Sequence, residues 1–365
     1  MKLLILHVIT TIDLGGAERQ LLTVAKCQKE MGSRVKVIFL KDFPKLADEF
    51  ISAGIEVNFE FAHLNFFEQV IKFRKYAKSL NDWVIHAHLP RAELLCSLAL
   101  PRNSFVLTRH NSENFFPDAP RVFSRILSRY VLHKAFAGIS ISHAVYSFLL
   151  TNKEISPSKN HFVIPYGMTN TQVSRVQGSF MHKDKFRIGT VSRLVPQKNI
   201  PLLLQACKIL LERSDIDFEL LIVGVGPQDF HLQELSRALG IARVVKWKGE
   251  THNVAEFYDQ LDLFVLTSNY EGFGLVLLEA MSKGLPVVAR NISAIPEVLG
   301  STHSGLVSRD DAQSFAQRIT QVLTDTTLYN NIVNYQALRL NKFSITNTQR
   351  QLESLYFSLL TRGRD

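Results

Sequence analysis

Residues 262–290 read DLFVLTSNYEGFGLVLLEAMSKGLPVVAR, and this stretch decides the predicted fold. The apolar run Leu263–Leu266 predicts a strand, and the longer apolar stretch Leu275–Lys283 predicts a helix. A Gly-Leu-Pro turn ends that helix and opens the next strand, Pro286–Ala289. A strand, a helix and a second strand joined by short turns form a βαβ unit, whose two strands run parallel.

The same alternation of apolar runs and helical patterns continues along the chain and falls into two series. Helical patterns such as Arg19–Met31 and Pro201–Arg213 separate the runs. We expect strands at Leu3–Thr10, Val35–Leu40, Trp83–His86, Phe105–Thr108 and Gly138–Ser140, and then at Phe186–Val191, Phe218–Val223, Val244–Trp247, Leu263–Leu266 and Pro286–Ala289. Two such series predict an α/β chain of two Rossmann-like, doubly wound domains.

The predicted domain borders follow from a polar stretch between the two series. Residues 167–185 contain Gly, Thr, Asn, Gln and Ser without a clear periodicity, as linkers do. We therefore predict a first domain over residues 1–168, a linker over 169–185 and a second domain over 186–346. A helical apolar pattern at 347–362 comes too late to belong to the regular alternation of the second sheet.

Composition is that of a globular protein, with 46% hydrophobic and 21% charged residues over 365 positions. The first apolar run is too short to span a bilayer and precedes Asp13 and Glu18 instead of a small-residue cleavage site, so we expect no signal peptide. Three scattered cysteines, Cys27, Cys96 and Cys207, lie among aliphatic residues. They favour core packing in a reducing, cytoplasmic compartment.

Positive charge is concentrated in the first half of the chain. Residues 1–175 hold 22 Lys and Arg against 14 Asp and Glu, whereas the other residues hold 20 against 19. Cations alternate with aromatic and aliphatic residues over Asn65–Leu80, and Arg121, Arg125 and Arg129 recur every four residues. Two interpretations stay open: contact with an anionic membrane surface, or cations facing water while the apolar residues face the core. No nucleic-acid-binding module is recognisable, so we expect no nucleic-acid partner.

Three loop sequences carry candidate chemistry. Gly15 and Gly16 follow the first strand and open a helix, where a backbone can approach a phosphate closely, although a tight turn alone would also use them. Arg193 and Lys198 follow the first strand of the second series and together suit a diphosphate. The strongest stretch is Glu271-Gly272-Phe273-Gly274, whose glycines free backbone amides at a helix start, with Glu279 about one turn into that helix.

Three histidines lie at predicted strand ends, where ligands of parallel sheets bind: His86, His88 and His110. A structural role and a functional role stay equally open for each of them. His86 and His88 have no evident third ligand, so we predict no metal site.

Together and in this order, these stretches resemble the retaining glycosyltransferases of family four. The resemblance covers nearly the whole chain and is densest over Ala255–Leu299. It implies the GT-B fold, in which two Rossmann-like domains face a central cleft and the last helix, at about 347–362, returns to the first domain. The chain departs from the family pattern at Tyr166 and Thr169, and again at Ser293-Ala294, where the family often has two glycines.

The resemblance also implies roles for individual residues. Catalytic roles fall on His110, Arg193, Lys198 and Glu271. Donor binding falls on Gly15, Gly16, Arg193, Lys198, Phe273, Gly274, Leu275 and Glu279. In this scheme the two cations hold the donor diphosphate, Glu271 contacts the transferred sugar, Glu279 binds the ribose, and His110 touches the sugar near its reacting carbon.

The implied activity is a retaining hexosyl transfer from a nucleotide diphosphate-sugar, with a UDP-sugar favoured, without a metal or other cofactor. We expect the acceptor to be a lipid-linked glycan or an envelope polysaccharide precursor, such as one of lipopolysaccharide. The basic first domain would then contact the inner face of the cytoplasmic membrane peripherally. The alternatives are a non-catalytic nucleotide-sugar-binding subunit or sensor, and a GT-B nucleotide-sugar epimerase.

Overall fold

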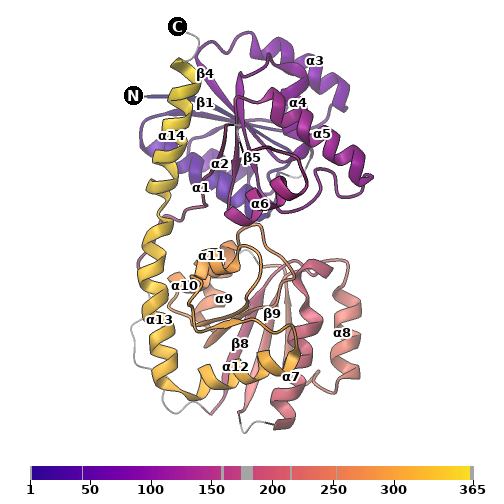
Figure 1. Cartoon of the computed structure of the whole chain (residues 1–365), viewed down its shortest axis with the longest axis vertical. Helices are drawn as coiled ribbons and strands as arrows, with labels where there is room; N and C mark the ends of the chain where they lie inside the picture. The colour runs from indigo at the N-terminus through magenta and orange to yellow at the C-terminus, as the bar shows by residue number, and fades with distance from the viewer. Residues whose placement is uncertain are drawn as a thin grey trace. The chain divides into compact units, whose positions relative to one another are not determined.

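The chain divides into two compact units, Met1–Thr169 with Phe343–Asp365, and Asn170–Lys342. The structure, a computed structural model, describes residues 2–42, 44–157, 160–173, 184–213, 216–251 and 253–361. Residues 174–183 of the predicted linker therefore lie outside the described residues. Each unit contains a parallel sheet with helices packed on it (Figure 1).

The first unit contains a seven-stranded sheet in the order β3-β2-β1-β4-β5-β6-β7. Its strands are β1 (Leu4–Ile9), β2 (Arg34–Phe39), β3 (Glu56–Asn58), β4 (Trp83–His88), β5 (Phe105–Arg109), β6 (Ala137–Ser140) and β7 (His161–Val163). The order reverses between β1 and β4, and the register pairs His7 of β1 with His86 of β4. Side chains two residues apart point to one face of a strand, so this register brings His7, His86 and His88 to the same face.

Helices of the first unit cover the sheet and close its core. They are α1 (Gly16–Glu30), α2 (Ala47–Ser52), α3 (Phe66–Ala77), α4 (Pro90–Ala99), α5 (Arg121–Lys134), α6 (His143–Thr151) and α14 (Ile345–Thr361). The last of these, drawn in yellow, lies against α1 (Figure 1). Leu352, Leu355 and Tyr356 of α14 are buried in one cluster with Leu3 and Ile5 of the amino-terminal strand region.

The second unit contains a six-stranded sheet in the order β10-β9-β8-β11-β12-β13. Its strands are β8 (Phe186–Val191), β9 (Phe218–Val223), β10 (Val245–Gly249), β11 (Leu263–Leu266), β12 (Val287–Arg290) and β13 (Leu306–Val307). Its helices are α7 (Ile200–Arg213), α8 (Asp229–Ala238), α9 (Val254–Asp259), α10 (Leu275–Ser282), α11 (Ile295–Leu299), α12 (Ala312–Thr324) and α13 (Thr326–Leu340). Short 3₁₀ turns occur at Pro196–Lys198 and Asn341–Phe343.

The prediction of an α/β chain with two Rossmann-like, doubly wound sheets is confirmed. The sequence prediction omitted three strands, β3, β7 and β13, which have only two or three residues each. Runs this short cannot display an alternating pattern, and the pairing of each with a longer neighbour makes it a strand.

Among the described residues, no helix is both long and apolar enough to cross a membrane. This observation agrees with the helix patterns, which are amphipathic and pack one face on a sheet.

Candidate active site

The order of strands in the second unit reverses between β8 and β11. Ligands of open parallel sheets bind beyond the carboxyl ends of the strands at such a reversal. The two loops that leave these strands contain Arg193 and Lys198 on one side and Glu271 on the other. The loops are joined directly: the Asn269 amide donates to the Gln197 carbonyl at 2.8 Å, and the Gln197 side chain donates to the Tyr270 carbonyl at 2.9 Å.

Lys198 and Glu271 form an ion pair at this junction. The Lys198 ammonium lies 2.7 Å from Glu271 Oε1, and their side chains are only 14% and 7% exposed. Ser268 Oγ donates to the same oxygen at 2.6 Å. The pairing holds both charged groups in place beneath the loops, where an unpaired charge would be costly.

Arg193 lies on the same loop but is exposed, and within the described chain no ion pair involves its guanidinium. Its loop rests on a second loop that sequence analysis missed, the Gly-Val-Gly turn at 224–226 after β9. A Cβ on Gly224 would lie 1.8 Å from the Ser192 carbonyl oxygen, and one on Gly226 would lie 2.4 Å from that of Leu194. Only glycine permits such a close approach of the two backbones. The two glycines directly after a predicted strand were the feature of the sequence that could have identified this loop.

The stretch singled out first in the sequence forms the amino end of α10. Gly274 is the N-cap residue with φ +93°, in the left-handed region, Phe273 is buried and Leu275 is the first helical residue. Backbone N–H groups at a helix start have no partner inside the helix and favour an anion. Ser293, at a position where the sequence departs from the family pattern, takes φ +53° and donates through Oγ to the Glu271 carbonyl at 2.8 Å.

Glu279 lies one turn into α10 and is half-buried. Its Oε2 accepts a hydrogen bond of 2.8 Å from the hydroxyl of Tyr258 on α9. Burial, together with the Glu279 carboxylate, raises the pKa of Tyr258 well above its ordinary value, so the phenol remains a donor. Tyr258 is a residue that sequence analysis missed, because it lies in an ordinary apolar helix pattern.

In the first unit, Gly15 and Gly16 lie where α1 begins, after β1, at the reversal of the first sheet. Glu18 occupies the space beside Gly15, because a Cβ there would lie 2.2 Å from Glu18 Oε2. Thr11 Oγ1 donates to the other Glu18 oxygen at 2.8 Å. The glycine therefore has a packing role against its own helix in addition to any role toward a ligand.

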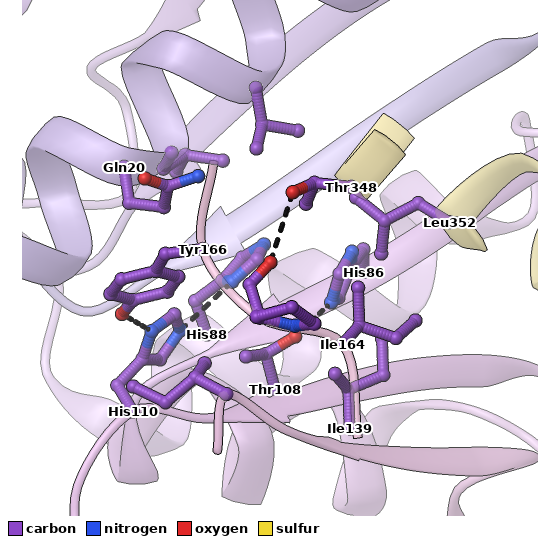
Figure 2. Close-up of a pocket in the computed structure, with 14 residues that line it drawn as sticks. Gln20, His86, His88, Thr108, His110, Ile139, Ile164, Tyr166, Thr348 and Leu352 are labelled. Atoms are coloured by element: carbon purple, nitrogen blue, oxygen red, sulfur yellow. Dashed lines mark hydrogen bonds between the residues drawn. The ribbon is translucent and has the colours of Figure 1, made fainter. Parts of the chain in front are cut away.

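His110 directly follows β5 and is one of a group of buried or half-buried histidines. Its Nε2 is 3.2 Å from Nδ1 of His88, and its Nδ1 is bonded to the hydroxyl of Tyr166 (Figure 2). Burial, and after it the charge of the neighbouring Arg109, lowers the pKa of His110 to about 3, so the imidazole is neutral near pH 7. His88 and His110 line a small cavity of about 30 Å³ together with Tyr166.

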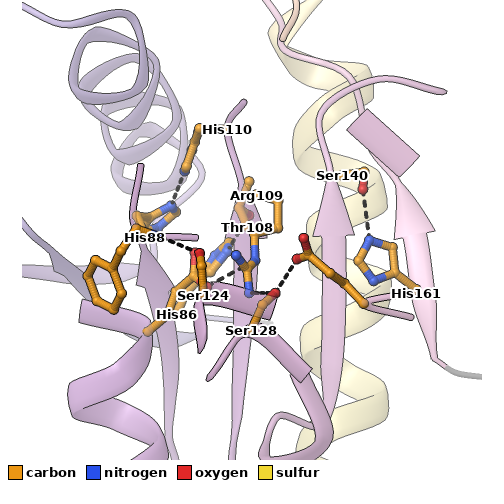
Figure 3. A network of polar contacts seen from close by, with 12 residues as sticks. His86, His88, Thr108, Arg109, His110, Ser124, Ser128, Ser140 and His161 are labelled. Atoms are coloured by element: carbon orange, nitrogen blue, oxygen red, sulfur yellow. Dashed lines mark hydrogen bonds and ion pairs between the residues drawn. The ribbon is translucent and has the colours of Figure 1, made fainter. Parts of the chain in front are cut away.

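A buried ion-pair network holds the residue before His110. Arg109 lies 3.1 Å from Glu93 of α4, donates to Ser128 of α5 at 2.9 Å, and stacks over the Phe115 ring at 4.4 Å. Ser128 in turn donates to Glu154. Figure 3 shows this network beside His88 and His110. It ties the end of β5 to two helices and thereby limits the positions that His110 can take.

His7, His86 and His88 lie close enough together to be considered as metal ligands. Each of their six ring nitrogens already has a hydrogen-bond partner: Gln28, His88, Tyr356, Thr108, His7 and His110. The rings of His86 and His88 are also stacked, with centroids 4.1 Å apart and planes 33° apart, so their lone pairs do not converge on one point. This geometry fits a hydrogen-bonded group better than a metal site.

The predicted site residues thus fall into two groups. One group lies at the strand-order reversal of the second unit and consists of Arg193, Lys198, Glu271, Phe273, Gly274, Leu275 and Glu279. His110, Gly15 and Gly16 lie at the carboxyl edge of the first sheet.

Comparison with known proteins agrees with this division. The profile of Glycosyltransferase Family 4 matches residues 14–168, and that of Glycosyl transferases group 1 matches residues 175–339. The chain belongs to this glycosyltransferase family. Its fold is GT-B, as in Anabaena HepE in complex with UDP and glucose, which matches with a TM-score of 0.82 and 22% identity over 98% of this chain and 100% of that one.

Curated relatives match this chain over part of their length. D-inositol 3-phosphate glycosyltransferase of Corynebacterium urealyticum is 35% identical over 184 residues, which is 48% of this chain and 43% of that enzyme. Lipopolysaccharide core biosynthesis mannosyltransferase LpsB of Rhizobium meliloti is 31% identical over 182 residues, 47% of this chain and 52% of that enzyme. The chain thus spans about half the length of these two relatives.

Proposed function

We propose that the protein transfers a hexosyl group, with retention, from a UDP-sugar to a lipid-linked glycan or envelope polysaccharide precursor. One observation carries the donor part of this proposal. A cationic loop and a glycine-capped helix start meet at the strand-order reversal of the second sheet, and the Lys198–Glu271 pair joins them at 2.7 Å. An anionic diphosphate is the ligand that this combination suits.

The chemistry follows from charge. Cleavage of a sugar–diphosphate bond leaves an oxocarbenium-like sugar and a more negative diphosphate. Arg193, Lys198 and the N–H groups at the start of α10 would stabilise that charge, and loss of one such donor in other enzymes costs about 10²–10³ in rate. We propose that these groups make a divalent metal unnecessary, and that the leaving phosphate takes the acceptor proton on the same face of the sugar.

UDP is the favoured donor nucleotide because HepE, a structural neighbour, was solved in complex with UDP and glucose. We assign Glu279 to the ribose hydroxyls, since its carboxylate is half-buried and held by Tyr258 close to the start of α10. In this scheme His110 contacts the transferred sugar.

The acceptor proposal rests on α5. Its buried face consists of Ser124, Ser128, Val131 and Leu132, whereas Val122, Phe123 and Ile126 are 60%, 54% and 57% exposed. Arg121, Arg125 and Arg129 are exposed on the same helix. An anionic bilayer would cover large apolar side chains that lie exposed beside arginines. The alternative, in which the cations face water and the apolar residues face the core, would leave these three apolar side chains buried. We therefore propose peripheral attachment of α5 to the inner leaflet of the cytoplasmic membrane.

A thermal-shift screen of the full chain against UDP, GDP, ADP and CMP, each with and without EDTA, tests the donor site. UDP at one hundred times its Kd should stabilise the protein by about 2.7 kcal/mol, with or without EDTA. Arg193→Ala should weaken UDP binding about tenfold or more, since a charge-assisted hydrogen bond is lost. Arg243→Ala is the matched control, because this exposed arginine precedes the edge strand β10 and so lies at the amino ends of the strands, whereas the candidate site lies at their carboxyl ends.

A stabilising effect that appears only with divalent metal would contradict the metal-free proposal. Binding of UDP without any release of sugar from UDP-sugars would instead favour a non-catalytic sensor. Retention is tested by the anomeric configuration of the product, determined by NMR.

Vesicle co-sedimentation tests the role of α5. The full chain should bind vesicles containing phosphatidylglycerol and not pure phosphatidylcholine, and a Val122→Ser, Phe123→Ser, Ile126→Ser variant should lose binding. Phe230→Ser is the control, because Phe230 is 77% exposed on α8 of the other unit. Equal binding by the triple variant and the wild type would remove α5 as the attachment surface.

A further inference from the structure

A continuous chain of hydrogen bonds crosses the first unit from α1 to the segment after β7. Gln28 Oε1 is 2.8 Å from Nε2 of His7, and Nδ1 of His7 is 3.0 Å from Nε2 of His88. His88 Nδ1 is 3.2 Å from Nε2 of His110, whose Nδ1 is bonded to the Tyr166 hydroxyl. We call these five residues the histidine chain; Figure 2 shows its end at His88, His110 and Tyr166.

The histidine chain has one direction when its members are neutral. His7 and His88 are 0% and 5% exposed, and burial keeps their pKa values below the ordinary range, to about 4 for His7. A neutral imidazole has one N–H and one bare nitrogen. The Gln28 oxygen can only accept, so His7 must donate through Nε2 and accept through Nδ1. The same alternation then applies to each histidine that follows.

Propagated along the chain, this rule assigns every proton. His88 donates through Nε2 to His7, His110 donates through Nε2 to His88, and the Tyr166 hydroxyl donates to Nδ1 of His110. If the Gln28 amide were turned over so that its NH₂ group faced His7, every hydrogen bond of the histidine chain would reverse its direction. The Gln28 side chain on α1 therefore decides the tautomer of His110, three hydrogen bonds away.

We propose that Gln28, His7, His88 and Tyr166 are positioning residues that hold His110 as its Nε2–H tautomer in one ring orientation. This inference rests on the proposed function, in which His110 contacts the transferred sugar. Both ring nitrogens of His110 are already bonded within the protein. His110 would therefore contact a sugar through its ring carbons, as an uncharged surface, and would not serve as a base.

His161 on β7 provides a control inside the same unit. Its Nε2 is 2.8 Å from the Ser140 hydroxyl, and neither residue belongs to the histidine chain. His86 does not serve as a control, because its partner Tyr356 also bonds Gln28. Ser140→Ala and Tyr166→Phe each remove a buried hydroxyl bonded to a histidine. Only the second belongs to the histidine chain.

The test is NMR of the full chain labelled with ¹⁵N in histidine, which reports the protonated nitrogen of each ring. The wild type should show His7, His88 and His110 as Nε2–H tautomers. Gln28→Met, which removes the acceptor, should mix the tautomers of all three, whereas Gln28→Glu, which keeps an acceptor oxygen, should preserve them. An unchanged signal from His161, which lies in the same unit and bonds Ser140 outside the histidine chain, verifies that each variant is folded.

Kinetics then test the positioning role. Gln28→Met and Tyr166→Phe should lower kcat roughly tenfold while leaving the KM for the donor within about twofold, since a misplaced group costs rate more than binding. Gln28→Glu should keep the wild-type kcat, and Ser140→Ala should leave kcat within about twofold of the wild type.

An Nδ1–H tautomer of His110 in the wild type would overturn the proposed proton assignment of the histidine chain. The same holds if Gln28→Met leaves the tautomers of all three histidines unchanged. Shifted tautomers with unchanged kcat would overturn its positioning role. Failure of the proposed function is recognised separately, because UDP would then give no thermal shift, whatever the NMR result.

Discussion

At the scale of single residues, Glu279 depends on a partner from another helix. A carboxylate one turn into a short helix has several rotamers in water, and only one can face a bound ribose. The Tyr258 hydroxyl, 2.8 Å away and on a side chain that is 2% exposed, selects the rotamer. Glu279 therefore loses its side-chain conformational entropy during folding, before any ligand binds, and not on binding.

Tyr258→Phe should therefore weaken UDP binding about tenfold or more, because one hydrogen bond to a charged group contributes about 1.5–3 kcal/mol. Isothermal titration of the full chain with UDP measures this change. Tyr335→Phe is the control, since that hydroxyl bonds Thr302 at 3.1 Å, away from the site. Equal affinities for Tyr258→Phe and wild type would remove Glu279 from the ribose site.

At the scale of elements, the start of α10 depends on a backbone conformation that favours glycine. Gly274 has φ +93°, and a Cβ there would lie 3.0 Å from the Leu277 side chain. Gly240 has φ +73°, but a Cβ there would meet nothing within 4 Å. The two positions share the conformational requirement and differ in what surrounds them.

Gly274→Ala and Gly240→Ala should each lower the free energy of unfolding by about 1–2 kcal/mol, because a residue with a Cβ is strained at positive φ. Only Gly274→Ala should also weaken UDP binding, by about tenfold, since it displaces the amides at the start of α10. Denaturant titration and UDP titration of both variants separate the two effects. Equal UDP affinities in the two variants would show that α10 does not bind the nucleotide.

At the scale of the whole molecule, buried neutral histidines link folding to pH. Burial lowers the pKa of His7 to about 4, of His161 to about 3 and of His303 to about 4. It also holds the pKa values of His86 and His88 well below 6.5. The unfolded chain takes up these protons first. Stability from these groups is therefore complete above pH 6.5 and is lost as the pH falls toward about 4.

Glu93 acts in the opposite sense, because burial raises its pKa to about 7 and the folded state then holds a proton that the unfolded state releases. Its contribution grows as the pH falls through 7 toward 4.5. The histidines outnumber it, so net stability should fall between pH 6.5 and 4. Each fully buried histidine accounts for at most roughly 3 kcal/mol of that fall.

Denaturant titrations from pH 7.5 to 4.5 should thus show stability decreasing with acidity. His303→Gln should flatten the pH dependence by up to one proton, because His303 is 4% exposed and bonded to Gln336. The exposed His231, changed to Gln, should leave the slope unaltered. A stability that rises from pH 6.5 to 4.5 in the wild type would contradict this account.

The sequence alone determined the architecture of this protein. Strand runs separated by helical patterns predict parallel sheets, because the hydrophobic period is local and parallel strands require a crossover between them. Gly274 and Glu279 were also predictable, since a glycine loop that opens a helix has a local signature in the residues around it. Family membership followed from several such local signatures in order.

Only the tertiary structure decided which side chains meet. Tyr258 reaches Glu279, Tyr356 reaches His86 across 270 positions, and Gln28 reaches His7 from a helix to a strand. No motif in the sequence marks Tyr258 or Gln28, because their roles come from strand order and helix packing. Hydrogen bonds depend on position to a fraction of an ångström, and spacing along a chain does not encode that distance between elements.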